Sequence, residues 1–411
     1  MRKVKECILH YPFLFVGVVV FFAHCLLHPF GDDIWWSNEI IADGYLKYFY
    51  FRYIGWTSRI LSEFLVNWFT KWPFICWQIA DSLIITILIR NMYRIIFSDD
   101  NRYLPMYLFV VSLFPLWEIS NAGWISTTIV YIWPYISFSY VFLIVKDCCH
   151  GKKIKNYQWF LYVVSILHSV NFEHTTIFLV VLPVYLILEN IVMHKRNDHL
   201  LYLTLFSGII GIVYTVTCPG NIQRFRVSEI PNWFPTFPML SFQDKIMIGV
   251  SDTIFHLIST PSLLYLFLLF CIFLYVHFHY NDIVYDTVNF LPLFICSVAF
   301  ALPIFHNGII GMSGYYILNA ESFHNLGSLL LYVAINWWLL LWPLLGLSLI
   351  FKNQLFFRVV AIYVTGFGIR VLMGFSPTVY VSGSRTFLPV YLSILIILIL
   401  IFKECNSRRE E

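Results

Sequence analysis

Charged residues are scarce in this 411-residue chain. Only 12% of the residues are Asp, Glu, Lys or Arg, whereas 59% are hydrophobic. An ordinary soluble domain carries about 25% charged residues, so the composition excludes a soluble globular enzyme. Apolar runs of about 18 or more residues recur along the whole chain, and each is long enough to cross a bilayer. The sequence therefore predicts an all-α polytopic membrane protein.

Three further absences narrow the class. The nine cysteines are scattered and form no CxxC pair, so they predict neither a disulfide framework nor a zinc site. The formal net charge is only +3, which gives no indication of a nucleic-acid partner. Neither a sequence repeat nor a low-complexity tract is evident. We therefore expect residues 1–411 to form a single transmembrane domain with no separate soluble domain.

The apolar runs predict about twelve transmembrane helices. The first run follows a short basic segment and has no small-x-small cleavage site, so we interpret it as an uncleaved first helix rather than a signal peptide. The predicted spans are residues 11–27, 73–96, 104–119, 126–146, 157–173, 175–193, 200–217, 260–279, 287–305, 325–350, 355–374 and 386–402.

The distribution of positive charge predicts the orientation. An even number of spans places both termini on one side, and 17 of the 26 Lys and Arg residues then fall on that side. By the positive-inside rule, both termini are cytoplasmic. The longer connections then face outward. They are a first outer loop, 28–72, with an amphipathic interfacial helix near 57–69, a second large loop, 218–259, and the shorter loops 306–324 and 375–385.

Two adjacent acids, Asp32 and Asp33, follow the first span directly. They are either solvated loop acids or a general base that meets a substrate delivered by the membrane, and adjacent side chains point in different directions. Their use as ligands of a divalent cation stays open, but no further ligand set accompanies them, so no metal site is predicted. Weaker candidates in the same loop are Glu39, Asp43 and Glu63.

Several arginines lie on the predicted outer face, against the topological bias. A guanidinium group offers a planar fork of donors that matches phosphate oxygens. Pairing with outer acids and snorkelling to lipid headgroups are the alternatives for any one of them. As a group they predict recognition of a phosphate or pyrophosphate, and they are Arg59, Arg224, Arg226, Arg370 and Arg385.

Other polar residues lie within or beside the predicted spans. Glu173 and His174 follow a tight turn between two spans, and ionisable groups at such depth usually face the protein interior or a wet cavity. Asp81 and Arg370 lie inside spans, and a pair between them is one hypothesis. Trp35 is typical of an interfacial aromatic belt, although a tryptophan face also suits a sugar ring.

The landmarks "GDDIWWS", "GWTSRILSEFL", "NAGWISTTIVYIWP", "NFEHTTIF", "CPGNIQRF" and "SGSRTFLPVYL" occur in this order over about residues 30 to 392. Their order resembles that of phage-type serotype-converting O-antigen glucosyltransferases and related polytopic proteins, within the GT-C glycosyltransferases. The resemblance implies a GT-C-like fold with interfacial helices in the first outer loop.

The resemblance also implies a reaction. A sugar, glucose in those relatives, would move from a polyprenyl-phosphate carrier to a cell-surface glycan such as O-antigen, on the periplasmic face of the bacterial inner membrane. Because "DD" is shared by many GT-C branches, it does not fix the sugar or the acceptor. The expected roles are catalytic base for Asp32 or Asp33, donor-phosphate binding for Arg59, Asn221, Arg224 and Arg385, and substrate binding for Trp35, Glu173 and His174.

Two alternative functions remain. A flippase or transporter of a lipid-linked sugar should show comparable polar landmarks on both faces and often an internal repeat. An O-antigen polymerase should rest on paired arginine-rich loops rather than on acids in the first outer loop. The acids of the first loop therefore favour a glycosyltransferase.

Overall fold

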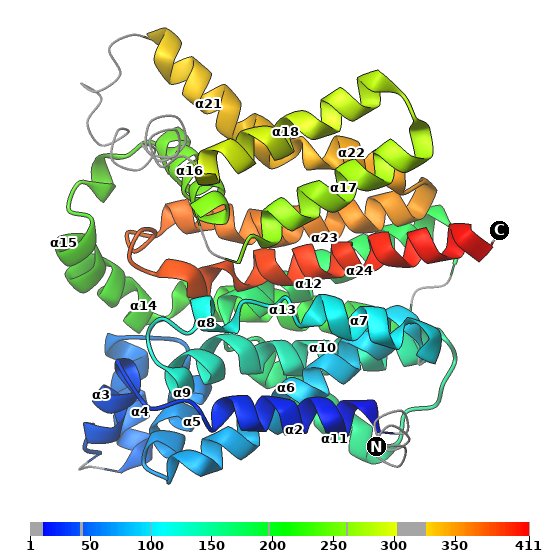
Figure 1. Ribbon diagram of the computed structural model, residues 1–411. Coiled ribbons are helices and arrows are strands. Elements are labelled where there is room, and N and C mark those ends of the chain that lie inside the picture. Colours follow the sequence, from blue (N-terminus) through cyan, green and yellow to red (C-terminus); the bar gives the residue numbers. More distant parts are fainter. Residues whose placement is uncertain are drawn as a thin grey trace. The chain divides into compact units, whose positions relative to one another are not determined.

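The computed structural model describes residues 11–41, 44–98, 100–195, 198–259, 262–301 and 326–410, and every regular element in these ranges is helical (Figure 1). Eight helices within them are long and apolar enough to cross a membrane. A ninth crossing arises if α16 (Phe242–Ser259) and α17 (Leu264–Tyr280), which meet at 84°, are counted as one span. The prediction of an all-α polytopic membrane protein is confirmed.

The chain divides into two compact units. Unit 1 comprises Met1–Leu104 and Ser120–Arg226, and unit 2 comprises Pro105–Ile119 and Val227–Glu411. The predicted first outer loop and the NFEH motif belong to unit 1. The second large outer loop is divided, because its first residues, up to Arg226, belong to unit 1 and the rest to unit 2.

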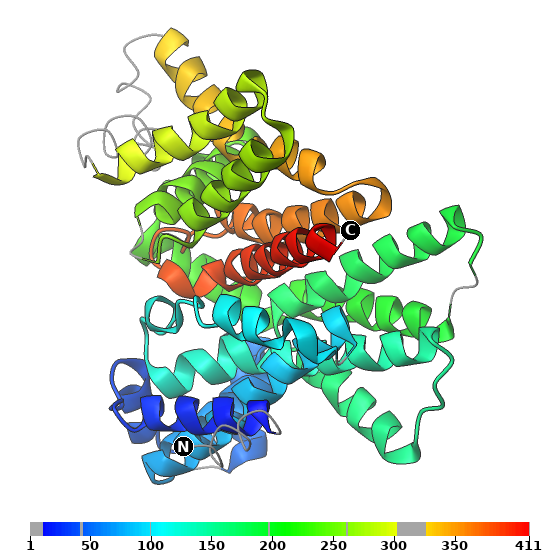
Figure 2. The same ribbon diagram turned by 45° about the vertical axis from the view of Figure 1, so that its right-hand side comes forward.

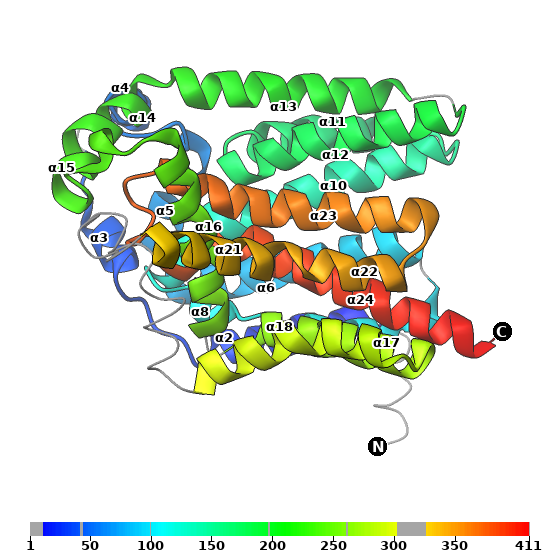
Figure 3. The same ribbon diagram turned by 90° about the horizontal axis from the view of Figure 1, so that it is seen from above.

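The frame of unit 1 consists of apolar helices that run alternately in opposite directions, because short connections join consecutive helices in its second half (Figure 3). One of these helices, α10, extends α9 (Trp124–Thr127) and the π-helical turn η2 (Thr128–Ile132), and together they make one candidate span. The frame helices are α2 (Pro12–His24), α6 (Phe74–Phe97), α10 (Trp133–Cys149), α11 (Asn156–Ser169), α12 (Glu173–Val192) and α13 (His199–Thr217).

Apolar side chains from α10 to α13 form a core in unit 1. Val141, Tyr162, Leu179 and Leu200 are completely buried within it. The Tyr162 hydroxyl lies 2.8 Å from Oγ1 of Thr204, so the polar end of this buried ring is also satisfied. The outward faces of the same helices are apolar as well, as expected where lipid rather than water surrounds a bundle.

Short helices gather at one end of unit 1. This end, which we call the loop end, is where α2 and α13 finish and α6, α10 and α12 begin (Figures 1 and 3). The predicted first outer loop supplies three of these helices, and the third contains the predicted amphipathic segment. They are α3 (Asp32–Asn38), α4 (Tyr45–Gly55) and α5 (Ile60–Thr70), joined by α14 (Pro219–Arg224).

Unit 2 is also built from apolar helices, of which α23 and α24 lie side by side (Figures 1 and 2). The connection between them contains the 3₁₀ turns η7 (Leu372–Phe375) and η8 (Gly383–Phe387), and the latter packs on α8. Besides α16 and α17, the helices of unit 2 include α8 (Leu116–Ile119), α15 (Ile230–Trp233), α18 (Ile283–Ala301), α21 (Leu326–Leu341), α22 (Pro343–Ile350), α23 (Asn353–Val371) and α24 (Leu388–Glu410).

Two predicted segments fold differently from expectation. The span expected at 104–119 is not one helix: α7 (Leu104–Val111) ends four residues before Pro115, which has no N–H group to continue a helical ladder. The expected outer loop 218–259 ends in an 18-residue helix, α16. The basic N-terminal segment, Asp43 and the expected outer loop 306–324 lie outside the described residues.

Candidate functional site

Asp33 caps a helix that lies 90 residues further along the chain. Its carboxylate accepts hydrogen bonds from the backbone N–H groups of Trp124 (2.7 Å), Ile125 (3.3 Å) and Ser126 (2.8 Å), and from the Ser126 hydroxyl (2.7 Å). The residue is only 1% exposed. Amide donors at a helix start otherwise lack partners. Asp33 therefore joins α3 to the start of α9.

Gly123 makes this cap sterically feasible. A Cβ at this position would lie 2.6 Å from Oδ1 of Asp33, and the backbone has φ near +142°, which L side chains rarely adopt. In the "AGW" segment, the glycine therefore leaves room for the Asp33 carboxylate and the tryptophan N–H donates a hydrogen bond to it.

Asp32 lies in a different environment. It is the first residue of α3, its backbone N–H donates to the carbonyl of Ala122 (2.7 Å), and its side chain is exposed. The structure thus separates the two acids: Asp33 is buried with four donors, whereas Asp32 is accessible. Which of them is the catalytic base stays a prediction, and the geometry favours Asp32.

A small pocket of about 190 Å³ opens beside Asp33. Its lining is largely apolar, with Pro29, Ile34, Trp72 and Phe74, and Asp33 is its single ionisable residue. No cation lines it, so this pocket is poorly suited to a phosphate group.

Arg52 links α3 to the rest of the loop end. Its guanidinium makes a bidentate ion pair with Glu63 at 2.7 Å for both contacts. It also lies 5.4 Å from the rings of both Trp36 and Trp56. Arg52 was not among the residues predicted for the site. The available signal was its position four residues before Trp56, because side chains at this spacing are neighbours on a helical surface.

Arg224 lies on the same tryptophan. Its guanidinium is 5.7 Å from the Trp56 ring. Trp36, Arg52, Trp56 and Arg224 therefore form a continuous series of cation–π contacts, each shorter than 6 Å. This series connects α3, which begins at Asp32, with α14.

Arg59 and Glu173 form the second ion pair of the loop end. Nε of Arg59 lies 2.9 Å and Nη2 lies 2.8 Å from Oε2 of Glu173, and both side chains are partly exposed. Burial alone lowers the pKa of the Arg59 guanidinium, but Glu173 and Tyr131 outweigh it and raise this pKa above its ordinary value. Arg59 is therefore a permanent cation, and it also lies over the Phe172 ring.

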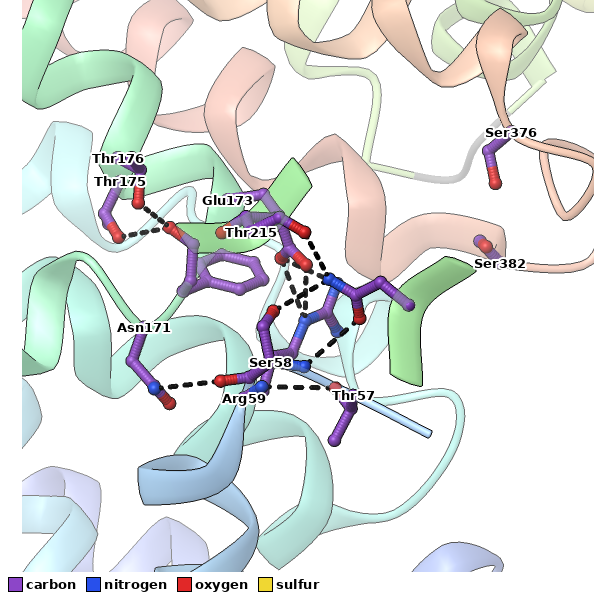
Figure 4. Close-up of polar contacts among 12 residues, drawn as sticks. Thr57, Ser58, Arg59, Asn171, Glu173, Thr175, Thr176, Thr215, Ser376 and Ser382 are labelled. Atoms are coloured by element: carbon purple, nitrogen blue, oxygen red, sulfur yellow. Dashed lines mark hydrogen bonds and ion pairs between the residues drawn. The ribbon is translucent and has the colours of Figure 1, made fainter. Parts of the chain in front are cut away.

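Amide side chains hold the short segment 57–59 in place (Figure 4). Asn221 accepts from the Ser58 N–H (3.1 Å) and donates to the Ser58 hydroxyl (3.0 Å). Asn171 and Tyr214 both donate to the Ser58 carbonyl, at 3.1 and 2.9 Å. In this structure the Asn221 amide orients the segment that carries Arg59. Its expected part in binding the donor phosphate stays a prediction.

Gly220 sets the approach of α14 to α4. A Cβ there would lie 2.5 Å from the Trp56 backbone nitrogen and 2.6 Å from the Tyr53 carbonyl oxygen. These are backbone atoms, so α14 would have to move. Arg224 and Asn221 would move with it, because both belong to this helix.

Gly220→Ala is therefore expected to disturb the loop end. We expect a loss of about 1–3 kcal/mol in stability, measured as a lower thermal midpoint. Gly55→Ala is the matched control, because its added Cβ would have Gln223 at 3.9 Å as its nearest neighbour. Equal behaviour of the two variants would contradict this account of α14.

The remaining predicted residues occupy varied positions. His174 is buried and packs against Phe172, with ring centroids 4.6 Å apart. It therefore supports the ring over which Arg59 lies. Trp35 is half exposed and makes an edge contact with Trp36. Arg385 belongs to unit 2, where its Nε donates to the Ser382 carbonyl at 3.0 Å. Its proposed role stays a prediction.

The hypothesised pair between Asp81 and Arg370 is wrong. Asp81 accepts a hydrogen bond from Nε1 of Trp133 (2.6 Å) and lies 3.3 Å from Nε2 of His24, all within unit 1. Arg370 instead pairs with Asp252 in unit 2. Partners separated by 57 or 118 residues carry no local signal in a sequence.

The described residues give little support to a divalent cation at the twin acids. Nowhere in the described ranges do three His, Cys, Asp or Glu side chains gather as a metal site would require. Both oxygens of Asp33 already accept from N–H groups, and a cation would have to displace those donors. The Asp33 carboxylate therefore does not fit a cation, and a cation at Asp32 stays a prediction.

Comparison of the chain with protein-family models, with curated proteins and with solved structures finds no match. The residues of the loop end are therefore the basis for assigning a function.

Proposed function

We propose that the protein is a membrane glycosyltransferase that moves a sugar from a polyprenyl-phosphate carrier to a cell-surface glycan. The observation that carries the proposal is the common position of an accessible acid and several guanidinium groups at the loop end of unit 1. They come from segments that are distant in sequence: Asp32 from α3, Arg59 from the start of α5, and Arg224 from α14.

The charges of this end suit a phosphate. Glu63 balances Arg52, and Glu173 balances one of the cations Arg59 and Arg224, because it pairs directly with the first and interacts electrostatically with the second. Among these three arginines and two glutamates, one net positive charge is left, in a setting rich in aromatic rings. Guanidinium groups provide the planar donor geometry that phosphate oxygens accept. We assign the carrier phosphate to Arg224 first, with Arg59 beside it.

The proposed reaction is a single displacement. The acceptor hydroxyl attacks the anomeric carbon, the bond from that carbon to the phosphate oxygen breaks, and the carrier phosphate departs with the electron pair. The Asp32 carboxylate takes the hydroxyl proton. The positive charge of Arg224 stabilises the anion that develops on the phosphate. Transfer in one step would invert the anomeric centre.

The finer topology belongs to the same proposal. We infer about twelve crossings in a GT-C-like arrangement, both termini in the cytoplasm and the loop end facing the periplasm of a bacterial inner membrane. The bias of positive charge toward the opposite loops supports this orientation.

Arg224→Ala is expected to weaken donor use. Loss of a charge-assisted contact to phosphate costs about 1.5–3 kcal/mol, so KM for the polyprenyl-phosphate sugar should rise about 10- to 150-fold. Steady-state transfer with donor varied at fixed acceptor measures this. Arg226→Ala removes an equal charge two residues away on an exposed side chain, and it should change KM little. Similar KM values for both variants would remove Arg224 from the phosphate site.

A further inference from the structure

A second polar cluster lies in unit 2, where α23 ends and α24 begins. Arg370, in the last turn of α23, pairs through Nη2 with Asp252 of α16. Its guanidinium lies 4.2 Å from the Phe387 ring. His256 also stacks on Phe387, with the ring centroids 3.7 Å apart. The Tyr391 hydroxyl of α24 lies 3.3 Å from Nε2 of His256.

Glu118 completes this group, which we call the Arg370 cluster. The Tyr391 hydroxyl donates to Oε2 of Glu118 at 3.1 Å. The members therefore come from four helices of one unit: α8, α16, α23 and α24. They are Glu118, Asp252, His256, Arg370 and Tyr391, with Phe387 between them.

The Arg370 guanidinium has more donors than the cluster uses. Its Nε and Nη1 are buried, and neither has a hydrogen-bond partner in the part of the chain that the structure describes. The residue is only 1% exposed. A buried donor without an acceptor is unfavourable, and native proteins rarely leave such groups unsatisfied. These donors indicate that an oxygen-bearing ligand enters the cluster.

Burial differs among the members. Arg370 and Tyr391 are almost completely buried, whereas Glu118, Asp252 and His256 are half-buried. Trp117, adjacent to Glu118, is 68% exposed and is one of the large aromatic surfaces of this unit. The cluster thus combines buried donors with partly buried acceptors, and the exposed Trp117 is the chain neighbour of one of those acceptors.

The net charge decides between ligand classes. Two carboxylates, Glu118 and Asp252, outweigh the single guanidinium of Arg370, so the cluster carries one net negative charge while His256 is neutral. A phosphate dianion would be repelled. A neutral ligand with several hydroxyls fits instead, because each hydroxyl can accept from the guanidinium and donate to a carboxylate.

We infer that the Arg370 cluster binds a neutral sugar residue, with Trp117 stacking on the ring. The assignment of that sugar to the acceptor glycan rests on the proposed function. The binding of a sugar does not rest on it, because that inference uses only the buried donors of Arg370, the net charge of the cluster and the exposed Trp117.

Saturation-transfer NMR on the full-length protein in lipid nanodiscs tests the inference, since nanodiscs avoid sugar-headed detergents. The probes are methyl glucoside, methyl galactoside and methyl mannoside, with inorganic phosphate as competitor. Wild-type protein should transfer saturation to at least one glycoside, and phosphate should not displace it. We expect Trp117→Ala and Glu118→Gln to weaken that binding about 10-fold or more. Both side chains reach solvent, and glutamine still accepts from Tyr391.

Trp233→Ala is the matched control, because it removes another exposed tryptophan of unit 2. It should bind like wild type. Absence of glycoside binding, equal binding by all variants, or displacement by phosphate would each overturn the inference. Asp32→Asn should retain glycoside binding. A wild-type protein that binds glycoside yet transfers no sugar would overturn the proposed function alone, and transfer without glycoside binding would overturn this inference alone.

Discussion

Asp32→Asn is expected to reduce sugar transfer by about 10²- to 10⁴-fold, the usual contribution of a general base. The asparagine amide keeps the size of the side chain but cannot take the acceptor proton. Because the Asp32 side chain is exposed, and its backbone N–H, which donates to Ala122, is unchanged by the substitution, the variant should fold normally. Initial rates of transfer to acceptor, measured at saturating donor, report the loss.

The KM for donor separates this effect from a binding defect. It should stay close to that of wild type, because the phosphate is assigned to Arg224 and Arg59. An Asp32→Asn variant that retains the wild-type rate would contradict the assignment of Asp32 as base.

Asp33→Asn is expected to have its main effect on folding. The substitution directs an amide NH₂ toward buried N–H donors of Trp124 and Ser126, which then lose a charged acceptor. Breaking a buried charged network of this kind costs about 3–5 kcal/mol. We therefore expect a large fall in the thermal midpoint in nanodiscs, followed by intrinsic tryptophan fluorescence, and lower yield from membranes.

Asp32→Asn is the matched control, since it makes the same chemical change one residue earlier. Gly123→Ala should reproduce the Asp33 result, because the added Cβ would lie only 2.6 Å from Oδ1 of Asp33 and would displace the carboxylate. If Asp33→Asn were as stable as wild type, the cap from α3 to α9 would not be a determinant of the fold.

Long apolar runs made several helices predictable from sequence. The predicted span 73–96 differs by one residue at each end from Phe74–Phe97, and the predicted span 200–217 differs by one residue at its start from His199–Thr217. The length of an apolar run directly reflects bilayer thickness. Mixed segments were less predictable: α16 carries Asp244, Lys245 and Asp252, which lower its hydropathy, and it was expected to be a loop.

The candidate site was predictable by residue type but not by partner. Scarce ionic residues in an apolar chain identified Asp33, Arg59 and Glu173, since a charge near hydrocarbon needs compensation. Their pairing could not be predicted, because the donors to Asp33 lie 91 to 93 residues away and Glu173 lies 114 residues from Arg59. Such contacts depend on how helices pack. Asp32 and Asp33 have the same side chain, and only the packing makes the first exposed and the second buried.

The most direct test is incubation of the purified protein in nanodiscs with undecaprenyl phosphate carrying a radiolabelled sugar and with an envelope glycan fraction. Wild-type protein should attach the label covalently to glycan, and Asp32→Asn, folded to the same extent, should attach at least a hundredfold less. Reconstituted vesicles would reveal a flippase by transbilayer movement of the donor. Movement of the donor without covalent transfer, or equal transfer by both proteins, would contradict the account.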